Sequence, residues 1–209
     1  MKIVKKSYLV GIAGNIGVGK TTLTKQLAER LNWKAFFESV IDNPFLDDFY
    51  SDMKRWSFNL QIYFLAHRFR TQREIYNLAY PAIQDRTIYE DVEIFARSLY
   101  EQGYMNERDY QTYRELFNNM VYFLPKPDLI IYLKASIKTL LARIKQRGRD
   151  YERTIPPDYL EYLNIAYEKW INDAREKFNV LTISADEIDF LQETEKFEEL
   201  VSAIRERCP

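Results

Sequence analysis

The stretch Gly14-Asn-Ile-Gly-Val-Gly-Lys-Thr21 constrains the fold more than any other part of the chain. It satisfies the pattern G-x-x-x-x-G-K-[ST] and stands between an apolar run at 8–13 and a helical pattern that begins at Lys20. The glycines allow a tight turn whose backbone N–H groups can form an anion cradle at a helix N-terminus. The sequence therefore predicts a strand, a phosphate-binding loop (P-loop) and a helix, in that order.

The loop indicates a site for a nucleoside triphosphate such as ATP. Its backbone amides would hold the phosphates, Lys20 would neutralise the β and γ oxygens, and the Thr21 hydroxyl would bind Mg²⁺. The candidate phosphate-binding residues of the loop are Gly14, Asn15, Ile16, Gly17, Val18, Gly19, Lys20, Thr21 and Thr22. The alternative, a glycine turn with a surface lysine, does not explain why the pattern lies between a strand and a helix.

Short apolar runs alternate with amphipathic stretches along the rest of the chain. The runs at 8–13, 34–38, 81–85, 128–133 and 179–184 are interpreted as buried strands. Helical spacing recurs over 20–31, 55–78, 91–101, 107–123, 137–147, 157–178 and 194–205. This alternation predicts an α/β fold of the P-loop NTPase type, with a doubly wound five-stranded parallel sheet flanked by helices.

Length and charge narrow the class of protein further. A chain of 209 residues, 46% of them hydrophobic, predicts a single domain over 1–209. Its 30 basic residues nearly balance 31 acidic ones, so net charge indicates neither a nucleic-acid nor a membrane partner. No stretch approaches the roughly 20 apolar residues of a membrane span, and we expect a cytoplasmic protein. The single cysteine, Cys208, is interpreted as an incidental tail thiol.

Three polar residues follow candidate strands and are expected to meet at the carboxyl edge of the sheet. Glu38 is placed to accept a proton from a hydroxyl that attacks the γ-phosphate. Asp85 would steady Mg²⁺ or its waters, and Arg86 would contact phosphate or orient Glu38. Taken singly, a solvated glutamate and a surface Asp–Arg pair remain the alternatives.

Arginines gather at the end of the helical stretch 137–147. Arg143 and Arg147 lie four residues apart on one helical face, and Arg149 follows. This spacing is typical of an arginine-rich lid, approximately 143–156, which would grip the equatorial oxygens of a phosphoryl group in transfer. A solvated basic helix end is the alternative.

A second helix offers polar groups to an acceptor. Gln61 and Arg68 are seven residues, or two turns, apart on one face, and a side-chain amide suits a nucleobase edge. The neighbouring aromatic side chains are expected to pack in the core. His67 has no second His or Cys nearby, which leaves Mg²⁺ as the only metal predicted.

Together, the segments "GNIGVGKT", "WSFNLQIYFLAHR", "DRTIYED", "RIKQRGRDYERTIP" and "YLEYLNIAYEKW" resemble the deoxyribonucleoside kinase family over nearly the whole chain. The resemblance implies a doubly wound parallel sheet and a homodimer assembled through helices. It implies transfer of the γ-phosphoryl group of ATP or another NTP to the 5′-hydroxyl of a deoxynucleoside in nucleotide salvage.

On the side of catalysis, the resemblance assigns Glu38 as general base, although Ser39 stands where the family usually has proline. Asp85 and Arg86 match the acidic residue and the arginine of the family's Glu/Asp-Arg-Ser motif, and Thr87 replaces its serine. The catalytic set is therefore Glu38, Arg86, Lys20 and Arg147, the lid arginines are Arg143, Arg147 and Arg149, and the candidate metal ligands are Thr21 and Asp85.

On the acceptor side, Tyr50 and Glu152 match residues that hold the sugar 3′-hydroxyl, and Gln61 matches the glutamine that contacts the base. Arg68 and Asp91 match a pair typical of members that act on purine deoxynucleosides and deoxycytidine. This favours a purine such as deoxyadenosine over thymidine. Asp189 and Phe190 resemble the segment that contacts the donor base.

Two rival functions remain open at this point. A nucleoside monophosphate kinase of the thymidylate kinase type shares a P-loop and an arginine lid, but it needs an arginine for its acceptor phosphate where this chain offers Tyr50 and Glu152. A regulatory P-loop protein would signal by shape, yet the chain carries neither a D-x-x-G nor an N-K-x-D motif.

Overall fold

A five-stranded, all-parallel sheet forms the centre of the computed structural model, which describes residues 7–38, 43–149, 152, 155–186 and 194–209. The strands are β1 (Leu9–Gly14), β2 (Lys34–Phe36), β3 (Ala82–Asp85), β4 (Leu129–Lys134) and β5 (Val180–Ser184). They are ordered β2-β3-β1-β4-β5. Each strand lies within two residues of the run that predicted it, so the predicted sheet is confirmed.

The helices follow the strands along the chain. They are α1 (Lys20–Leu31), α2 (Leu46–Ser51), α3 (Met53–Tyr76), α4 (Ile88–Glu90), the π-helix η1 (Asp91–Ala96), α5 (Arg97–Glu101), α6 (Glu107–Val121), α7 (Ile137–Arg147), α8 (Pro157–Ala174) and α9 (Thr194–Arg207). Helix α2 was not predicted, and the helix expected over 91–101 begins at Ile88 and contains a π-helical turn. Helix α8 ends at Ala174 rather than at residue 178.

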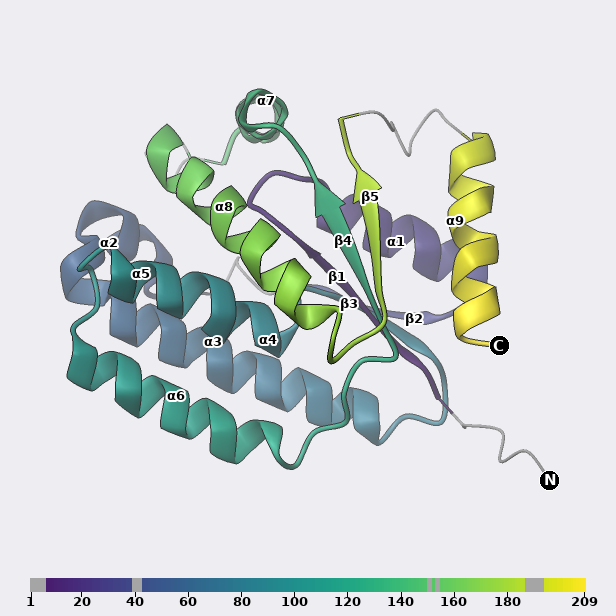
Figure 1. Ribbon diagram of the computed structural model, residues 1–209, viewed down its shortest axis with the longest axis horizontal. Helices are drawn as coiled ribbons and strands as arrows, with labels where there is room; N and C mark the ends of the chain where they lie inside the picture. Colours follow the sequence, from purple (N-terminus) through teal and green to yellow (C-terminus); the bar gives the residue numbers. More distant parts are fainter. Residues whose placement is uncertain (1–6, 39–42, 150–151, 153–154, 187–193) are drawn as a thin grey trace.

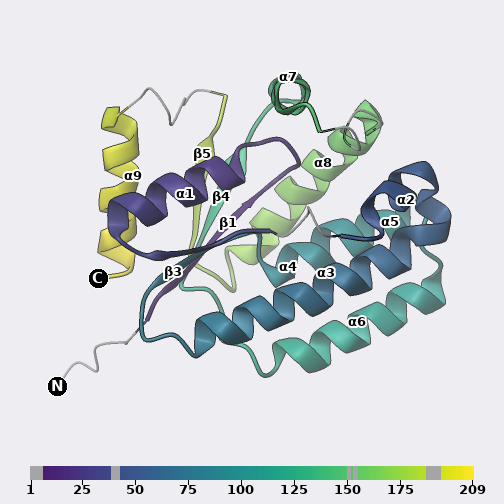
Figure 2. The same cartoon turned by 180° about the vertical axis from the view of Figure 1, so that it is seen from behind.

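Helices cover both faces of the sheet (Figure 1). Helices α1 and α9 lie on one face, where their apolar side chains form one core with β1 and β4, and the view from behind brings α1 to the front (Figure 2). The other face carries α3, α5 and α8, with α6 packed outside α3. This arrangement confirms the doubly wound class, and none of the described helices combines the length and apolar character that a membrane-spanning segment needs.

The prediction that all the strands are buried was wrong for the two outer ones. Strands β1 and β3 are buried throughout, and every residue of β4 except the last, Lys134, is buried. Residues of β2 and β5 are partly exposed, because an edge strand has a neighbouring strand on one side only.

Two small residues show how tightly the elements pack. Gly11 of β1 lies against Thr87, and a Cβ atom at position 11 would stand 2.3 Å from the Thr87 Cγ2 methyl carbon. Cys208 is 3% exposed and packs in the core between α1, α9 and the sheet. The interpretation of this cysteine as an incidental tail thiol was therefore wrong, because its side chain fills core volume.

Candidate active site

The glycine-rich loop leaves β1 and enters α1 as the sequence predicted. Gly14, Gly17 and Gly19 have φ of 149°, 83° and 104°, values that residues with a side chain rarely adopt. A Cβ at Gly17 would also approach Ile144 Cγ1 of α7 to 2.7 Å. The loop therefore needs glycine both for its turn and for its contact with α7.

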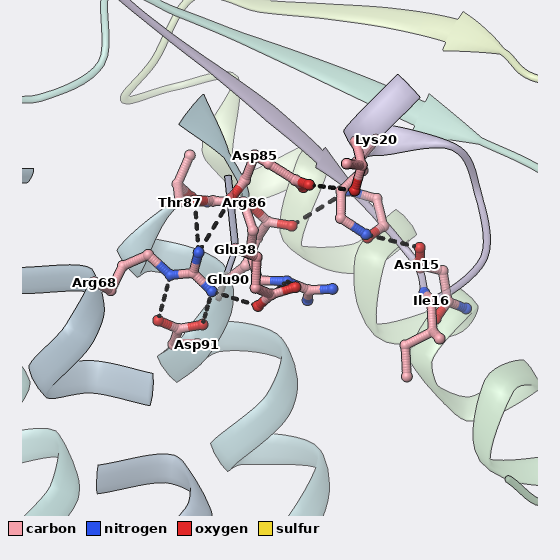
Figure 3. A network of polar contacts seen from close by, with 12 residues as sticks. Asn15, Ile16, Lys20, Glu38, Arg68, Asp85, Arg86, Thr87, Glu90 and Asp91 are labelled. Carbon is pink, nitrogen blue, oxygen red and sulfur yellow. Dashed lines mark hydrogen bonds and ion pairs between the residues drawn. The ribbon is translucent and has the colours of Figure 1, made fainter. Parts of the chain in front are cut away.

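Lys20, the first residue of α1, folds back onto this loop (Figure 3). Its Nζ donates to the carbonyl oxygens of Gly14 at 2.9 Å and Asn15 at 3.0 Å. Burial, assisted by the positive charge of Arg86, lowers the pKa of Lys20 to about 8. The ammonium group is thus held among backbone oxygens that an incoming phosphate would replace.

The Asn15 side chain joins the loop to α8. Its Oδ1 accepts from the backbone N–H of Ile16 at 2.7 Å. Its Nδ2 donates to Leu160 O at 2.9 Å and to Asn164 Oδ1 at 2.7 Å. Of the other loop residues, Val18 contributes a carbonyl that accepts from Arg143, and Thr22 is exposed in the first turn of α1.

Thr21 and Asp85, the two predicted metal ligands, are in contact. Thr21 Oγ1 donates to Asp85 Oδ2 at 2.6 Å, while Asp85 Oδ1 is buried without a hydrogen-bond partner among the described residues. Burial raises the pKa of Asp85 against the opposing charge of Lys20. A hydroxyl and a carboxylate with an unused oxygen fit the hard oxygen ligands that Mg²⁺ prefers. In the described part of the chain no three His, Cys, Asp or Glu side chains cluster as a metal cage, so phosphate and water would supply the remaining ligands.

Glu38 lies two residues beyond β2 and contacts two arginines. Arg68 Nη2 donates to Glu38 Oε1 at 2.6 Å, and Arg86 Nε lies 3.1 Å from the same oxygen. Burial opposes ionisation of Glu38, but the charges of Arg86 and Arg68 prevail and lower its pKa to about 2. This carboxylate is therefore ionised at any physiological pH.

Arg68 is the centre of this network. Its guanidinium donates to Asp91 at 3.1 and 3.4 Å, and to the backbone oxygens of Asp85 and Arg86 at 3.1 and 3.3 Å. Burial raises the pKa of Asp91 to about 6 although the Arg68 charge opposes this. Arg68 was predicted as a substrate-binding residue, and in this structure it fixes the backbone and carboxylates around Glu38.

Arg86 has the left-handed φ of 68°, which costs a non-glycine residue about 1 to 3 kcal/mol. Several contacts hold it there. Its backbone N–H donates to Ile12 O at 3.0 Å, its Nη1 donates to Tyr167 OH at 3.3 Å, and its guanidinium carbon lies 4.2 Å from the centre of the Phe95 ring. The Arg86 guanidinium, which follows the end of β3, thus lies between the P-loop and Glu38.

Sequence reasoning gave no role to Glu90, which is fully buried beside the P-loop. Its carboxylate accepts from Gly14 N at 3.2 Å, from Thr87 N at 2.7 Å and from Tyr167 OH at 2.8 Å. The T-x-x-E spacing of Thr87 and Glu90 is a capping-box pattern, and the structure contains that box at the start of α4. That pattern was the available signal for this residue.

The predicted lid arginines make contacts within the chain. Arg143 donates to Val18 O at 2.6 Å and to Ala185 O at 2.9 Å, which ties α7 to the P-loop and to the end of β5. Arg147 donates through Nε to Glu152 Oε2 at 2.9 Å and through Nη2 to Oε1, and Arg149 lies 3.6 Å from Glu152. Only part of the segment 143–156 is described, and its action as a lid stays a prediction.

The remaining acceptor residues lie on α2 and α3. Tyr50 of α2 is partly buried and meets the Phe49 ring edge-on at 5.1 Å. Gln61 of α3 is buried, and its Oε1 has no hydrogen-bond partner within the described ranges. Asp189 and Phe190 fall outside the described residues.

The structure therefore joins the P-loop, the Asp85–Arg86 strand end, Glu38 and the Arg68–Asp91 pair in one polar network (Figure 3). A separate cluster holds Arg147, Arg149 and Glu152. One side of the network offers N–H groups and cations to phosphate. The other offers an ionised carboxylate to a hydroxyl. Such an arrangement can bind a phosphoryl donor and accept the proton of the group that it phosphorylates.

Comparison with known proteins supports the same interpretation of the site as one for phosphoryl transfer. The family model described as "Deoxynucleoside kinase" matches residues 10–209. A deoxyadenosine/deoxycytidine kinase of Bacillus subtilis is 43% identical over 206 residues, which cover 96% of this chain and 93% of that protein. A deoxyadenosine kinase of Dictyostelium discoideum is 46% identical over 85% of this chain and 72% of its own length. The structure of M. mycoides deoxyadenosine kinase with bound dATP superposes with a TM-score of 0.83 at 33% identity, covering 93% of this chain and 99% of that one.

Proposed function

The chain belongs to the deoxynucleoside kinase family and is a deoxynucleoside kinase, and we propose that it phosphorylates the 5′-hydroxyl of deoxyadenosine with ATP and Mg²⁺. Deoxycytidine and deoxyguanosine are the next acceptors in this proposal. The single observation that carries the chemistry is the partly buried contact of Glu38 with Arg86, near Lys20 of the P-loop.

Glu38 acts as the general base in the proposed mechanism. The acceptor 5′-oxygen attacks the γ-phosphorus, the bond from that phosphorus to the β–γ bridging oxygen breaks, and the hydroxyl proton passes to the carboxylate. A carboxylate with a pKa near 2 is a weak base. It suffices here because phosphoryl transfer has a loose transition state, in which the hydroxyl proton is lost only as the new bond forms.

Cations stabilise the charge that moves with the phosphoryl group. Lys20 exchanges the Gly14 and Asn15 carbonyls for β and γ oxygens, and Arg86 extends from the end of β3 toward the same group. Arg147 and Arg149 would leave Glu152 to grip the phosphoryl group in transfer, and Arg143 holds the Val18 carbonyl of the loop. Thr21 and Asp85 would hold Mg²⁺, which neutralises phosphate charge when bound.

The acceptor preference rests on Gln61, Arg68 and Asp91. Gln61 Oε1 is buried and has no hydrogen-bond partner within the described residues. It can therefore accept a hydrogen bond from an exocyclic amino group such as that of adenine or cytosine. The Arg68–Asp91 pair, which the resemblance gives as typical of members acting on purine deoxynucleosides and deoxycytidine, contacts Glu38 through Arg68. Two relatives named for deoxyadenosine support the same choice. Tyr50 and Glu152 would bind the sugar 3′-hydroxyl.

The assembly and the location of the protein belong to the proposal as well. Family resemblance supports a homodimer, and the balanced charge with a single buried cysteine suits the cytoplasm. Light scattering on the purified protein at micromolar concentration tests the dimer, since a monomer mass would contradict it.

A phosphorylation assay tests the function. ATP and Mg²⁺ are offered with deoxyadenosine, deoxyguanosine, deoxycytidine, thymidine and thymidine monophosphate in parallel, and kcat/KM is measured for each acceptor. We expect deoxyadenosine to have the highest value and thymidine to be poor. The highest value for another nucleoside would overturn the base assignment, and product from thymidine monophosphate alone would contradict the nucleoside acceptor.

A further inference from the structure

The site contains a buried chain of hydrogen bonds that the proposed mechanism does not use. It begins at Arg86, whose Nη1 donates to Tyr167 OH at 3.3 Å. The same hydroxyl donates to Glu90 Oε1 at 2.8 Å, and that oxygen also accepts from the backbone N–H of Gly14 at 3.2 Å. One carboxylate on α4 thereby connects the arginine at the end of β3 to the first residue of the P-loop.

The tyrosine in this chain has a fixed position and a fixed protonation state. Tyr167 of α8 is fully buried, stacks on Tyr132 with ring centres 5.7 Å apart, and meets Phe95 edge-on at 6.5 Å. Burial first, and then the charge of Glu90, raise the pKa of its hydroxyl well above the ordinary value. The hydroxyl therefore keeps its proton: its oxygen accepts a hydrogen bond from Arg86, and its O–H donates one to Glu90.

Glu90 is held just as firmly. Its second oxygen accepts from the Thr87 backbone N–H at 2.7 Å and from the Thr87 hydroxyl at 3.2 Å. Because Thr87 directly follows Arg86, the same carboxylate fixes the backbone on one side of the left-handed arginine and, through Tyr167, the guanidinium head. A carboxylate used only to cap a three-residue helix would not need the Gly14 and Tyr167 contacts.

We propose that Glu90 and Tyr167 are positioning residues that aim the Arg86 guanidinium at the phosphoryl group and keep it in register with the P-loop. This inference rests on the proposed role of Arg86 in catalysis. Neither residue touches substrate in this account. Their effect is expected on kcat, since Arg86 acts on charge that develops in the transition state.

Tyr167→Phe tests the inference, because it keeps the ring and removes only the hydroxyl. We expect kcat for the preferred nucleoside to fall about tenfold or more while its KM changes by less than about threefold. Repeating the change in an Arg86→Lys background should lower kcat by less than about twofold, since the group that Tyr167 positions is already altered. An equal loss in both backgrounds, or no loss in either, would overturn the proposal.

Tyr132→Phe is the matched control. This tyrosine packs on the same Tyr167 ring, but its hydroxyl donates to Glu168 at 3.0 Å and, among the described residues, forms no hydrogen bond with Arg86. We expect its kcat to stay within about twofold of wild type. Glu90→Gln, in which the amide nitrogen can no longer accept from Thr87 or Tyr167, repeats the cycle if Tyr167→Phe does not fold.

A measurement that needs no turnover separates this inference from the proposed function. The Arg86 Nε–H resonance, assigned by its loss in Arg86→Lys, should be sharp in wild type and Tyr132→Phe and broadened or shifted in Tyr167→Phe. An unchanged resonance in Tyr167→Phe contradicts the positioning role even if the wild type phosphorylates deoxynucleosides. An inactive wild type with the expected resonance change contradicts only the proposed function.

Discussion

Arg147 and Glu152, which we assign to the phosphoryl donor and to the acceptor sugar respectively, are paired with each other through two hydrogen bonds. The Glu152 side chain is only 4% exposed, whereas Arg147 is 34% exposed. If these proposed roles hold, the sugar hydroxyl would approach a carboxylate that already binds Arg147. Acceptor binding and the position of Arg147 would then be linked through the Glu152 side chain.

Glu152→Ala should discriminate between acceptors with and without a 3′-hydroxyl. We expect kcat/KM for the preferred 2′-deoxynucleoside to fall about 10²-fold more than that for its 2′,3′-dideoxy analogue, because only the former loses a hydrogen bond, whereas Arg147 loses its partner with either acceptor. Steady-state kinetics on the two acceptors provide the measurement, with Glu161→Ala on the exposed side of α8 as control. Equal losses on both acceptors would contradict the proposed contact of Glu152 with the sugar 3′-hydroxyl.

Glu38→Gln should separate binding from turnover. We expect the rate of a single turnover to fall by about 10² or more, while the nucleoside Kd measured by calorimetry stays within a few-fold of wild type. Glu74→Gln, the same change in an exposed ion pair with Lys34, should leave both values unchanged. Near-normal turnover in Glu38→Gln would exclude this carboxylate as the base.

The lowered pKa of Lys20 gives donor binding a pH dependence. With a pKa of about 8 in the free enzyme, Lys20 is largely neutral at pH 8.5, and the phosphates of ATP favour its charged form. Binding at that pH should therefore take up about 0.8 proton, and ATP affinity should fall as pH rises above 8. Calorimetry in two buffers of different ionisation enthalpy measures the uptake.

Lys20→Arg and Lys25→Arg provide the comparison for this proton uptake. An arginine does not titrate in this range, so Lys20→Arg should take up no proton. Lys25 is exposed on α1, and its replacement should leave the uptake at the wild-type value. Uptake that persists in Lys20→Arg would assign the proton to another group.

Asp85→Asn should weaken the response to Mg²⁺. We expect the Mg²⁺ concentration for half-maximal activity to rise about tenfold or more, because the carboxylate beside Thr21 loses its charge. Asp52→Asn is the control: Asp52 caps α3 by accepting from Arg55 N at 3.0 Å, and asparagine caps a helix equally well. An unchanged Mg²⁺ titration in Asp85→Asn would contradict the metal assignment.

Much of the fold could be predicted because its signals are local. The P-loop pattern and the apolar runs each lie within a few residues of the element that they specify. The N-caps of α6 and α7 are local in the same sense, since Asn106 and Ser136 accept from backbone N–H groups three residues later. Helix α2 was missed because six residues are too few to display a helical period.

The long-range contacts of the site could not be predicted in the same way. The spacing of Gln61 and Arg68 predicted that they share a helix face, and both are buried. The Arg68–Asp91 pair was expected from the family resemblance alone, and nothing in the sequence named Glu38 as a further partner of Arg68. Tyr167 and Glu90 are 77 positions apart, and their hydrogen bond exists only because α8 and α4 pack beside the same loop. Such pairings follow from the tertiary fold and leave no local pattern.

The contact between Gly11 and the Thr87 methyl has a consequence for related sequences. A serine at position 87 lacks the Cγ2 atom that a Cβ at position 11 would meet at 2.3 Å. Alanine is therefore expected at position 11 only in chains that carry serine at 87, so the two positions should covary across the family. In this chain, Gly11→Ala alone should be destabilising, and Thr87→Ser should restore much of the loss, as compensated substitutions do during divergence.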